Sequence, residues 1–417
     1  MHIRKLLLLL PFFGACSVGD AVRRLGGADD ETAYDRYARG LRAAGLDSTA
    51  LGREWLAASD SAIRAPLLVT LPLREAGFYN RSEARAVAHR FQLLDGQRIV
   101  ATVRTAGLPA HLFIDLYEET SDTLRPFIHR ATGDSAEAAD SSVGPHVGLE
   151  YEARRSGSYV LRIQAELLRS GRYDLTLRAE PSLAFPVQGT GNRAVLSFFG
   201  AERDGGRRSH HGIDIFAARG TPVLAASDGL VRSTRSNELG GNVVWLRDDA
   251  RGHTLYYAHL DRHAVSAGQP VRAGDTIGFV GNTGNARTTR PHLHFGIYRR
   301  GEGPIDPYPF VRLVTAQPAA LAADTSKLGS LGIISARRTP LLITPGATGD
   351  TVRSLAPNTA VQIVGAAGRW YRVQLEDGVA GYVAARAISA RRPPVNVAAT
   401  SRASSATAIP SGSSSSR

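Results

Sequence analysis

Apolar and polar residues alternate with a period of two along much of this 417-residue chain. The pattern is clear in RFQLLDGQRIVATVR, AHLFIDLYEE and GRYDLTLRA, which are separated by Gly, Asp and Ser turns. Successive residues of a strand point to opposite faces, so this alternation predicts strands with one buried face. Several such strands in a row predict a β-sandwich over residues 83–182, and we expect the whole chain to be mainly β.

Three further segments have different patterns. The stretches ETAYDRYARGLRAAGL and STALGREWLAAS, within residues 17–72, repeat apolar residues every three to four positions, with Ser48 and Thr49 as candidate caps. This spacing predicts a helical N-terminal region. Within residues 332–390, the stretch from Arg338 to Ile388 predicts five short strands joined by tight turns. Residues 391–417, rich in Ser, Ala, Pro and Arg, predict a disordered tail.

The N-terminus predicts an export signal over residues 1–16. Two basic residues precede an apolar run from Leu6 to Phe13, and two small residues then lead to Cys16. A membrane-spanning helix needs about 20 apolar residues, so this run is too short to remain as one. Its order of charged, apolar and small residues is that of a signal peptide. Cys16 is the single cysteine, so no disulfide can form within the chain.

The net charge of +12 would suit an anionic partner such as a nucleic acid. Only Lys5 and Lys327 are lysines, however, and all other basic residues are arginines. No Arg-rich block alternates with aromatic residues, as it would on a nucleic-acid-binding face. We therefore expect no nucleic-acid partner, and a coding preference for arginine accounts for the charge as well as a partner would.

Seven of the twelve histidines lie between residues 210 and 294. In HLHFGIY, apolar residues alternate with His292 and His294, so this segment predicts a strand that points both imidazoles to one face. In HHGID, His210 and Asp214 lie four apart across Gly212. A hydrolytic zinc site needs three protein ligands and an open position for water. His210, Asp214 and His294 can supply two nitrogens and one oxygen for such a site.

These motifs closely resemble the M23 family of zinc metallopeptidases, the lysostaphin-like or LytM-type endopeptidases. The family pattern is His-x-x-x-Asp, then Tyr-x-His-Leu, then His-x-His, and the sequence has HHGID, YAHL and HLH in that order. The stretches GTPVLAASDGLV, GQPVRAGDTIGFVGNTG and PHLHF extend the match, and we expect an antiparallel β peptidase domain over residues 190–312. The resemblance implies a Zn²⁺ cofactor bound by His210, Asp214 and His294. It also selects His210 over its neighbour His211, which we expect to point away.

The resemblance further implies that His292 and His259 face the zinc-bound water as catalytic residues without binding the metal. It does not decide which of the two is the general base. Period-two alternation in TLYYAHL predicts that His259 shares a face with Tyr257. His253 and His263 have no role in the family pattern, and we expect both at the surface.

The sequence departs from the family pattern at two positions beside the expected site. Arg290 stands where many family members have glycine, and Gly296 stands where they have glutamate. We interpret Arg290 as a substrate-binding residue that receives a carboxylate; a solvated arginine without a role is the alternative. A higher KM of Arg290→Ala for peptides that carry this carboxylate would support the first interpretation, and an unchanged KM would exclude it.

Three weaker resemblances concern the flanking segments. FGAC resembles a bacterial lipobox, which implies lipidation of Cys16; an ordinary signal with an incidental cysteine is the alternative. Ser17 then favours an outer-membrane lipoprotein that faces the periplasm. The phrase SGSYVLRI…SGRYDLTL resembles the pre-peptidase C-terminal type of sandwich. Residues 332–390 resemble a bacterial SH3-like domain, in which Trp370, Tyr371 and Tyr382 either bind a cell-wall ligand or, as we favour, form the core.

Together these features predict an exported cell-envelope protein, a zinc-dependent metalloendopeptidase that hydrolyses peptide cross-links of peptidoglycan. A non-catalytic LytM-type activator of a cell-wall amidase is the alternative, and the complete ligand set disfavours it. GQPVRAGDTIGFVG also resembles the hairpin of biotinyl or lipoyl carriers, but no lysine lies between residues 6 and 326 to be modified. The sequence indicates no oligomeric state.

Overall fold

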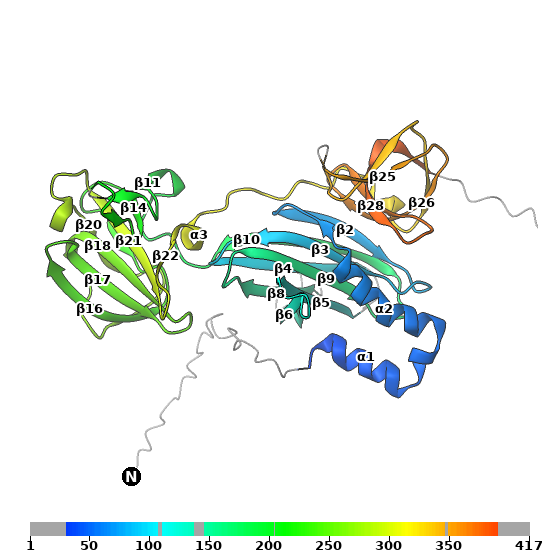
Figure 1. Cartoon of the computed structure of the whole chain (residues 1–417), viewed down its shortest axis with the longest axis horizontal. Coiled ribbons are helices and arrows are strands. Elements are labelled where there is room, and N and C mark those ends of the chain that lie inside the picture. Colours follow the sequence, from blue (N-terminus) through cyan, green and yellow to red (C-terminus); the bar gives the residue numbers. More distant parts are fainter. Residues whose placement is uncertain (1–30, 107–110, 137–145, 204, 347–348, 391–417) are drawn as a thin grey trace, which may run out of the picture.

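The computed structural model describes residues 31–106, 111–136, 146–203, 205–346 and 349–390. Cys16 and the predicted tail therefore lie outside the described residues. Three β bodies lie in a row (Figure 1): a unit that carries the clustered histidines, a central sandwich and a smaller C-terminal unit. The fold is mainly β, as the alternation predicts. None of the helices in this part of the chain is long and apolar enough to cross a membrane.

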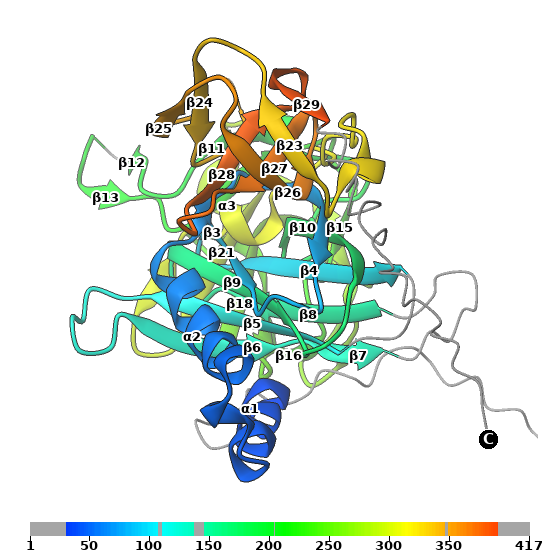
Figure 2. The ribbon, with the colours of Figure 1, turned by 90° about the vertical axis from the view of Figure 1, so that its right-hand side faces the viewer.

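Two helices precede the sandwich and lie on the side away from the C-terminal unit (Figures 1 and 2). The helices are α1 (Ala33–Ala43) and α2 (Ala50–Arg64). Thr32 caps α1 and Thr49 caps α2, each through a side-chain oxygen that accepts a hydrogen bond from a backbone N–H of the first turn. Ser48, the other candidate cap, instead ends the short 3₁₀-helix before α2.

The helical region is shorter than the spacing predicts, because Pro66 follows α2. Proline disfavours helical backbone at the preceding residue and has no N–H to donate. The chain continues as strand β1 (Leu67–Leu68), which pairs with the sandwich. Trp55 of α2 anchors the helices: it is 1% exposed, and its Nε1 donates to the Ala165 carbonyl at 2.8 Å.

The sandwich consists of two sheets that share one apolar core. The first has the order β1-β3-β9-β5-β6, with β3 (Ala86–Leu93), β9 (Gly157–Ala165), β5 (Leu112–Glu119) and β6 (Phe127–Thr132). The second contains β2 (Leu73–Tyr79), β10 (Gly171–Pro181), β4 (Gln97–Ala106), β8 (His146–Glu152) and β7 (Asp134–Ala136), in that order. Inward residues of both sheets, such as Ile99, Ile114 and Leu175, are completely buried.

The histidine-bearing unit is built on an antiparallel sheet. Its main path runs β11 (Val195–Ser197), β14 (Ile213–Phe216), β21 (His292–Arg299), β18 (His253–His263), β17 (Gly241–Asp248), β16 (Gly229–Asn237) and β19 (Pro270–Val271). Shorter strands complete this sheet: β15 (Pro222–Leu224), β20 (Thr276–Val280) and β22 (Gly303–Ile305). A separate hairpin pairs β12 (Glu202–Arg203) with β13 (Arg208–Ser209). One face of β21 and β18 lies in a core that contains Leu255, Tyr257, Phe295 and Ile297, all 0% exposed.

This unit contacts the sandwich through the end of β21 that is distant from His292. Arg299, the last residue of β21, donates to Asp95 at 2.8 Å. Arg251 bridges the two units as well, with Glu152 at 2.9 Å and Asp248 at 3.0 Å. With a rise of about 3.3 Å per residue, these contacts lie roughly 20 Å from His292. The sandwich therefore holds the unit by the end opposite to the histidines.

The C-terminal unit extends the second sheet of the sandwich. It contains β23 (Leu331–Ile334), β24 (Thr339–Leu342), β25 (Thr351–Leu355), β26 (Ala360–Ala367), β27 (Trp370–Gln374), β28 (Ala380–Ala384) and β29 (Ile388–Ala390). Five of these strands, β24 to β28, lie within residues 338–388, where the sequence predicts five strands, and β23 and β29 lie at the two ends of this stretch. β26 pairs with β2 in antiparallel register. Tyr371 and Tyr382 are 1% and 0% exposed, and Tyr382 and Trp370 pack against the sandwich core, so these aromatic residues serve packing.

A buried ion pair lies beneath the β2–β26 junction. Glu75 of β2 is 0% exposed and accepts hydrogen bonds from Arg372 Nε at 2.9 Å and Tyr382 Oη at 2.6 Å. Burial raises the pKa of the Glu75 carboxyl, but Arg372, His89 and Tyr382 together outweigh burial and lower this pKa to about 2. Arg372 Nη2 also donates to Tyr173 at 3.2 Å. The carboxylate is thus charged and buried, with Arg372 and Tyr382 as partners across the junction and His89 Nε2 of its own unit at 3.4 Å.

We expect Arg372→Met to lower the free energy of unfolding by about 3–5 kcal/mol, because a buried charge that loses its partner stays desolvated. Urea unfolding at neutral pH measures this loss. Arg353→Met is the matched control, since it breaks an exposed ion pair with Asp377 and should leave the stability nearly unchanged. Equal effects of the two substitutions would show that the buried pair does not stabilise the junction.

Candidate metal and catalytic site

Strand pairing brings two of the predicted metal ligands together. β14 and β21 are antiparallel, with Asp214 directly opposite His294. Residues opposite each other in a sheet point to the same face, so the carboxylate and the imidazole stand side by side. His210 lies just before β14 and is held by its backbone N–H, which donates to the Ala201 carbonyl at 2.9 Å. A Cβ on Gly212 would lie 2.4 Å from the Phe295 carbonyl, so only glycine allows this close approach.

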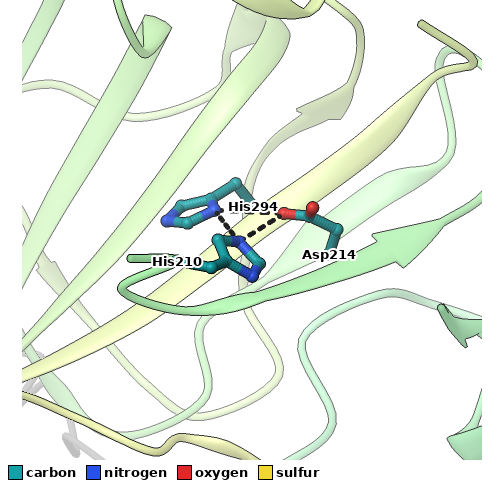
Figure 3. Close-up of side chains that lie close together, drawn as sticks. All are labelled: His210, Asp214 and His294. Carbon is teal, nitrogen blue, oxygen red and sulfur yellow. Dashed lines mark hydrogen bonds and ion pairs between the residues drawn. The ribbon is translucent and has the colours of Figure 1, made fainter. Parts of the chain in front are cut away.

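The donor atoms of the three residues converge, as Figure 3 shows. His210 Nε2 lies 3.0 Å from Asp214 Oδ1 and 3.0 Å from His294 Nδ1. His294 Nδ1 lies 3.1 Å from Asp214 Oδ1. Two imidazole nitrogens and one carboxylate oxygen are a donor set typical of zinc in hydrolases. The residues present therefore fit a metal ion, and the cluster is the candidate metal site.

The protonation state of the cluster suits metal binding. Burial raises the pKa of the Asp214 carboxyl, but hydrogen bonds with His210 and His294 outweigh burial, and the net shift is strongly downward. Burial lowers the pKa of His294, and its contact with Asp214 only partly offsets this effect. At neutral pH the carboxylate is therefore charged and His294 is uncharged, as ligands must be.

Backbone carbonyls orient the other imidazoles. His210 Nδ1 lies 2.9 Å from the Phe198 carbonyl, His292 Nδ1 lies 2.8 Å from the Arg290 carbonyl, and His259 Nδ1 lies 2.9 Å from the Thr283 carbonyl. A carbonyl only accepts, so Nδ1 carries the proton in each neutral ring and Nε2 keeps its lone pair. This arrangement provides one ligand atom, at His210, and two proton acceptors, at His259 and His292.

His259 and His292 lie beside the metal cluster on the same face. Their ring centroids are 5.1 Å apart, and the His259 ring lies 5.9 Å from that of His294. His292 also stacks on Phe216 at 4.9 Å. Burial, reinforced by His292 and His294, lowers the pKa of His259 to about 4. His259 is thus uncharged at neutral pH and can accept a proton there.

A β-bulge turns His259 toward the site. Val244 of β17 pairs with Tyr257, whereas Asn242, two residues earlier, pairs with Leu260, three residues later on β18. β18 therefore holds one extra residue at this point, and His259 adopts a positive φ of 64°. Tyr257 faces the buried core, so the prediction that His259 shares its face is wrong. Regular alternation would point the imidazole into the apolar core with Tyr257, and the bulge turns it to the face of His292 and His294 instead.

The remaining predicted residues lie outside the cluster. Arg290 is exposed, with its guanidinium carbon 5.6 Å from the Phe216 ring, so it lies near His292. His211 is exposed, away from the cluster. His253, predicted at the surface, is only 4% exposed, and its Nε2 accepts from Arg299 at 3.3 Å. The prediction failed for His253 because the junction with the sandwich, a tertiary contact, covers this end of β18.

Sequence reasoning missed two polar residues that contact the cluster. Arg203 Nη2 donates to Asp214 Oδ2 at 2.7 Å and to Ser197 Oγ at 2.6 Å. Ser197 Oγ lies 3.3 Å from His210 Nδ1. Neither residue has a spacing to the histidines that predicts this contact, because the hairpin β12–β13 and the edge strand β11 bring them in. Tyr256 is a third neighbour, with its ring edge-on to His294 at 5.7 Å.

We expect the protein to bind one Zn²⁺ per chain. His294→Ala should weaken binding by more than the roughly 10–100-fold typical of losing a residue that only orients a ligand, because it removes a ligand itself. His292→Ala is the matched control on the same strand face and should retain the metal. Metal content after dialysis and competition with a chelator measure both. Loss of the metal in His292→Ala, but not in His294→Ala, would show that His292 is the metal ligand and His294 is not.

Residues 208–307 match the model for peptidase family M23. The chain is 39% identical over 140 residues to the L-Ala--D-Glu endopeptidase of Bacillus subtilis (strain 168), an alignment that covers 31% of this chain and 43% of that protein. It is 41% identical over 128 residues to the DD-carboxypeptidase/endopeptidase Mpg of Neisseria meningitidis serogroup B, and this alignment covers 30% of this chain and 29% of that protein. The chain thus spans less than half the length of these curated relatives.

Solved structures also resemble this part of the chain. The catalytic domain of the antimicrobial peptidase lysostaphin from Staphylococcus simulans is 34% identical and covers 28% of this chain and 89% of that chain, with a TM-score of 0.26. The structure of LytU is 36% identical, and the alignment covers 30% of this chain and 87% of that chain, with a TM-score of 0.27. Both alignments cover less than a third of this chain.

Proposed function

From the peptidase M23 domain that residues 208–307 form, we propose that the protein is a zinc-dependent metalloendopeptidase that hydrolyses peptide cross-links of peptidoglycan. The observation that carries the proposal is the convergence of three ligand atoms about 3 Å apart beside two further histidines with free Nε2 atoms. The relatives named above are endopeptidases, which supports the same reaction class. A complete ligand set supports catalysis over the alternative of a non-catalytic amidase activator.

His210, Asp214 and His294 would hold the Zn²⁺. When bound, zinc lowers the pKa of a coordinated water toward neutrality and polarises the scissile carbonyl. The His259 ring lies 5.1 Å from that of His292 and 5.9 Å from that of His294, so these two histidines lie beside the ligand residues. The residues present could therefore hold a metal with two proton-accepting groups beside it.

His259 and His292 would move the proton. Each keeps its Nε2 lone pair, because its Nδ1 is hydrogen-bonded to a backbone carbonyl. Such a nitrogen can accept a proton from the nucleophilic water and donate it to the departing amine. The protonated ring can also stabilise the negative charge that develops on the carbonyl oxygen. Arg290, exposed near His292, would receive a substrate carboxylate.

We propose that the protein works in the cell envelope, as an outer-membrane lipoprotein facing the periplasm. The sequence FGAC at the end of the signal supports a lipid anchor at Cys16, and peptidoglycan is a substrate that such an anchor would keep within reach. Radiolabelled palmitate fed to expressing cells should label the full chain but not Cys16→Ser. Equal labelling of the two proteins would exclude Cys16 as the anchor.

One digestion tests the activity. Residues 17–417 are incubated with cross-linked peptidoglycan, with a chelator and after Zn²⁺ is added back, and the products are identified by mass. We expect cross-linked dimers to disappear, with a chelator-sensitive and zinc-restored rate that His294→Ala abolishes. The masses identify the bond that is cleaved.

Intact dimers from a folded, zinc-loaded protein would contradict the proposal. An amidase mixed into the same digestion then distinguishes the alternative function. Faster release of stem peptides by the amidase in the presence of this protein would identify an activator instead.

A further inference from the structure

Arg203 lies on a short hairpin that flanks the metal cluster. β12 and β13 pair with each other, with Arg203 opposite Arg208, and form no ladder with the main sheet. The side chain of Arg203 is 33% exposed, whereas that of Asp214, its partner, is 10% exposed. The guanidinium thus extends from an accessory hairpin to a mostly buried carboxylate.

The two oxygens of Asp214 have different partners. Oδ1 lies 3.0 Å from His210 Nε2 and 3.1 Å from His294 Nδ1, within the cluster of ligand atoms. Oδ2 accepts from Arg203 Nη2 at 2.7 Å, a distance typical of a charge-assisted hydrogen bond. A carboxylate can bind a metal through one or both oxygens. With Oδ2 engaged by the guanidinium, only Oδ1 is directed at the metal position.

The same nitrogen of Arg203 reaches a second ligand through Ser197. Nη2 donates to Ser197 Oγ at 2.6 Å, and this oxygen lies 3.3 Å from His210 Nδ1. Ser197 is also the register partner of Asp214 in the β11–β14 pair. The next residue, Phe198, accepts from His210 through its carbonyl at 2.9 Å. Arg203 therefore connects the orientations of Asp214 and His210.

We propose that Arg203 is a positioning residue of the metal centre. It holds Asp214 as a ligand through Oδ1 alone and, with Ser197, keeps Asp214 and His210 in the mutual orientation that the metal requires. The inference rests on the proposed function, because it assigns Arg203 to the same metal site. Its Nη2 bonds both Asp214 and Ser197, so this nitrogen is directed at the ligands.

Arg203→Met tests the proposal, because methionine keeps an unbranched side chain and removes the donors. Metal affinity is measured on the full protein without substrate, by competition for Zn²⁺ with a chromophoric chelator. We expect a roughly 10–100-fold loss of affinity, the range for residues that orient ligands. Arg203→Lys should restore part of it, since one ammonium can reach Asp214 but cannot reproduce the planar fork. Arg232→Met, at an exposed arginine on β16, should change nothing.

A double-mutant cycle tests the connection to His210. Ser197→Ala alone should weaken metal binding in the same direction, and adding it to Arg203→Met should cost less than the sum of the two changes. If the losses of metal affinity in the two single variants add fully in the double variant, Arg203 acts on Asp214 alone, and its proposed connection to His210 through Ser197 is overturned. Equal thermal stability of the metal-free variants excludes a folding defect as the cause.

Other outcomes separate this inference from the proposed function. If Arg203→Met keeps wild-type metal affinity, the inference is overturned, and a higher KM would then make Arg203 a substrate contact. If the wild type binds Zn²⁺ and Arg203→Met binds it more weakly, but neither digests peptidoglycan, Arg203 keeps its role and the proposed substrate is wrong. If the wild type binds no Zn²⁺, both proposals are overturned.

Discussion

The antiparallel register of β14 and β21 is the constraint on which the site depends. It places Asp214 opposite His294, and the same alternation along β21 brings His292 to that face. A shift of one residue would turn all these side chains into the core, where Leu293 and Phe295 now lie with 0% exposure. Burial of the apolar residues on one face therefore specifies the register, and the register positions the polar residues on the other. The pairing of β14 with β21 thus determines both the packing of the apolar face and the arrangement of the site residues on the opposite face.

Hydrogen bonds to the backbone then decide which atom of each ring is free. Three of the four histidines at the site have Nδ1 next to a backbone carbonyl, which leaves Nε2 for the metal or for a proton. His294 differs, since its Nδ1 lies in the ligand cluster. These partners come from loops outside the strands that carry the rings, and Arg203 acts on Asp214 in a similar way from an accessory hairpin. A second set of contacts thus orients the ligands, as is general for metal sites in proteins.

The sandwich and the C-terminal unit are joined firmly to each other, and within the described ranges their junction with the histidine-bearing unit lies away from His292. β26 continues the sheet of β2 across a buried Glu75–Arg372 pair, so the C-terminal unit and the sandwich share backbone pairing as well as a core. The sandwich contacts the histidine-bearing unit at Asp95 and Arg251, at the end of β21 distant from His292. Among the described residues, these junctions place the flanking units at the end of the histidine-bearing sheet that is distant from the candidate site.

The sequence by itself determined the β class, the spacing of His210 from Asp214, and the common face of His292 and His294. These features depend on local periodicity, which is a property of neighbouring residues. Tertiary structure alone decided the rest. A bulge directs His259 to the site against the alternation of its strand. The junction with the sandwich buries His253, and the hairpin β12–β13 brings Arg203 to Asp214. The burial of His253 and the contact of Arg203 depend on segments that are distant in the sequence. The bulge, like these two features, depends on how whole elements pack, and no short sequence pattern encodes such packing.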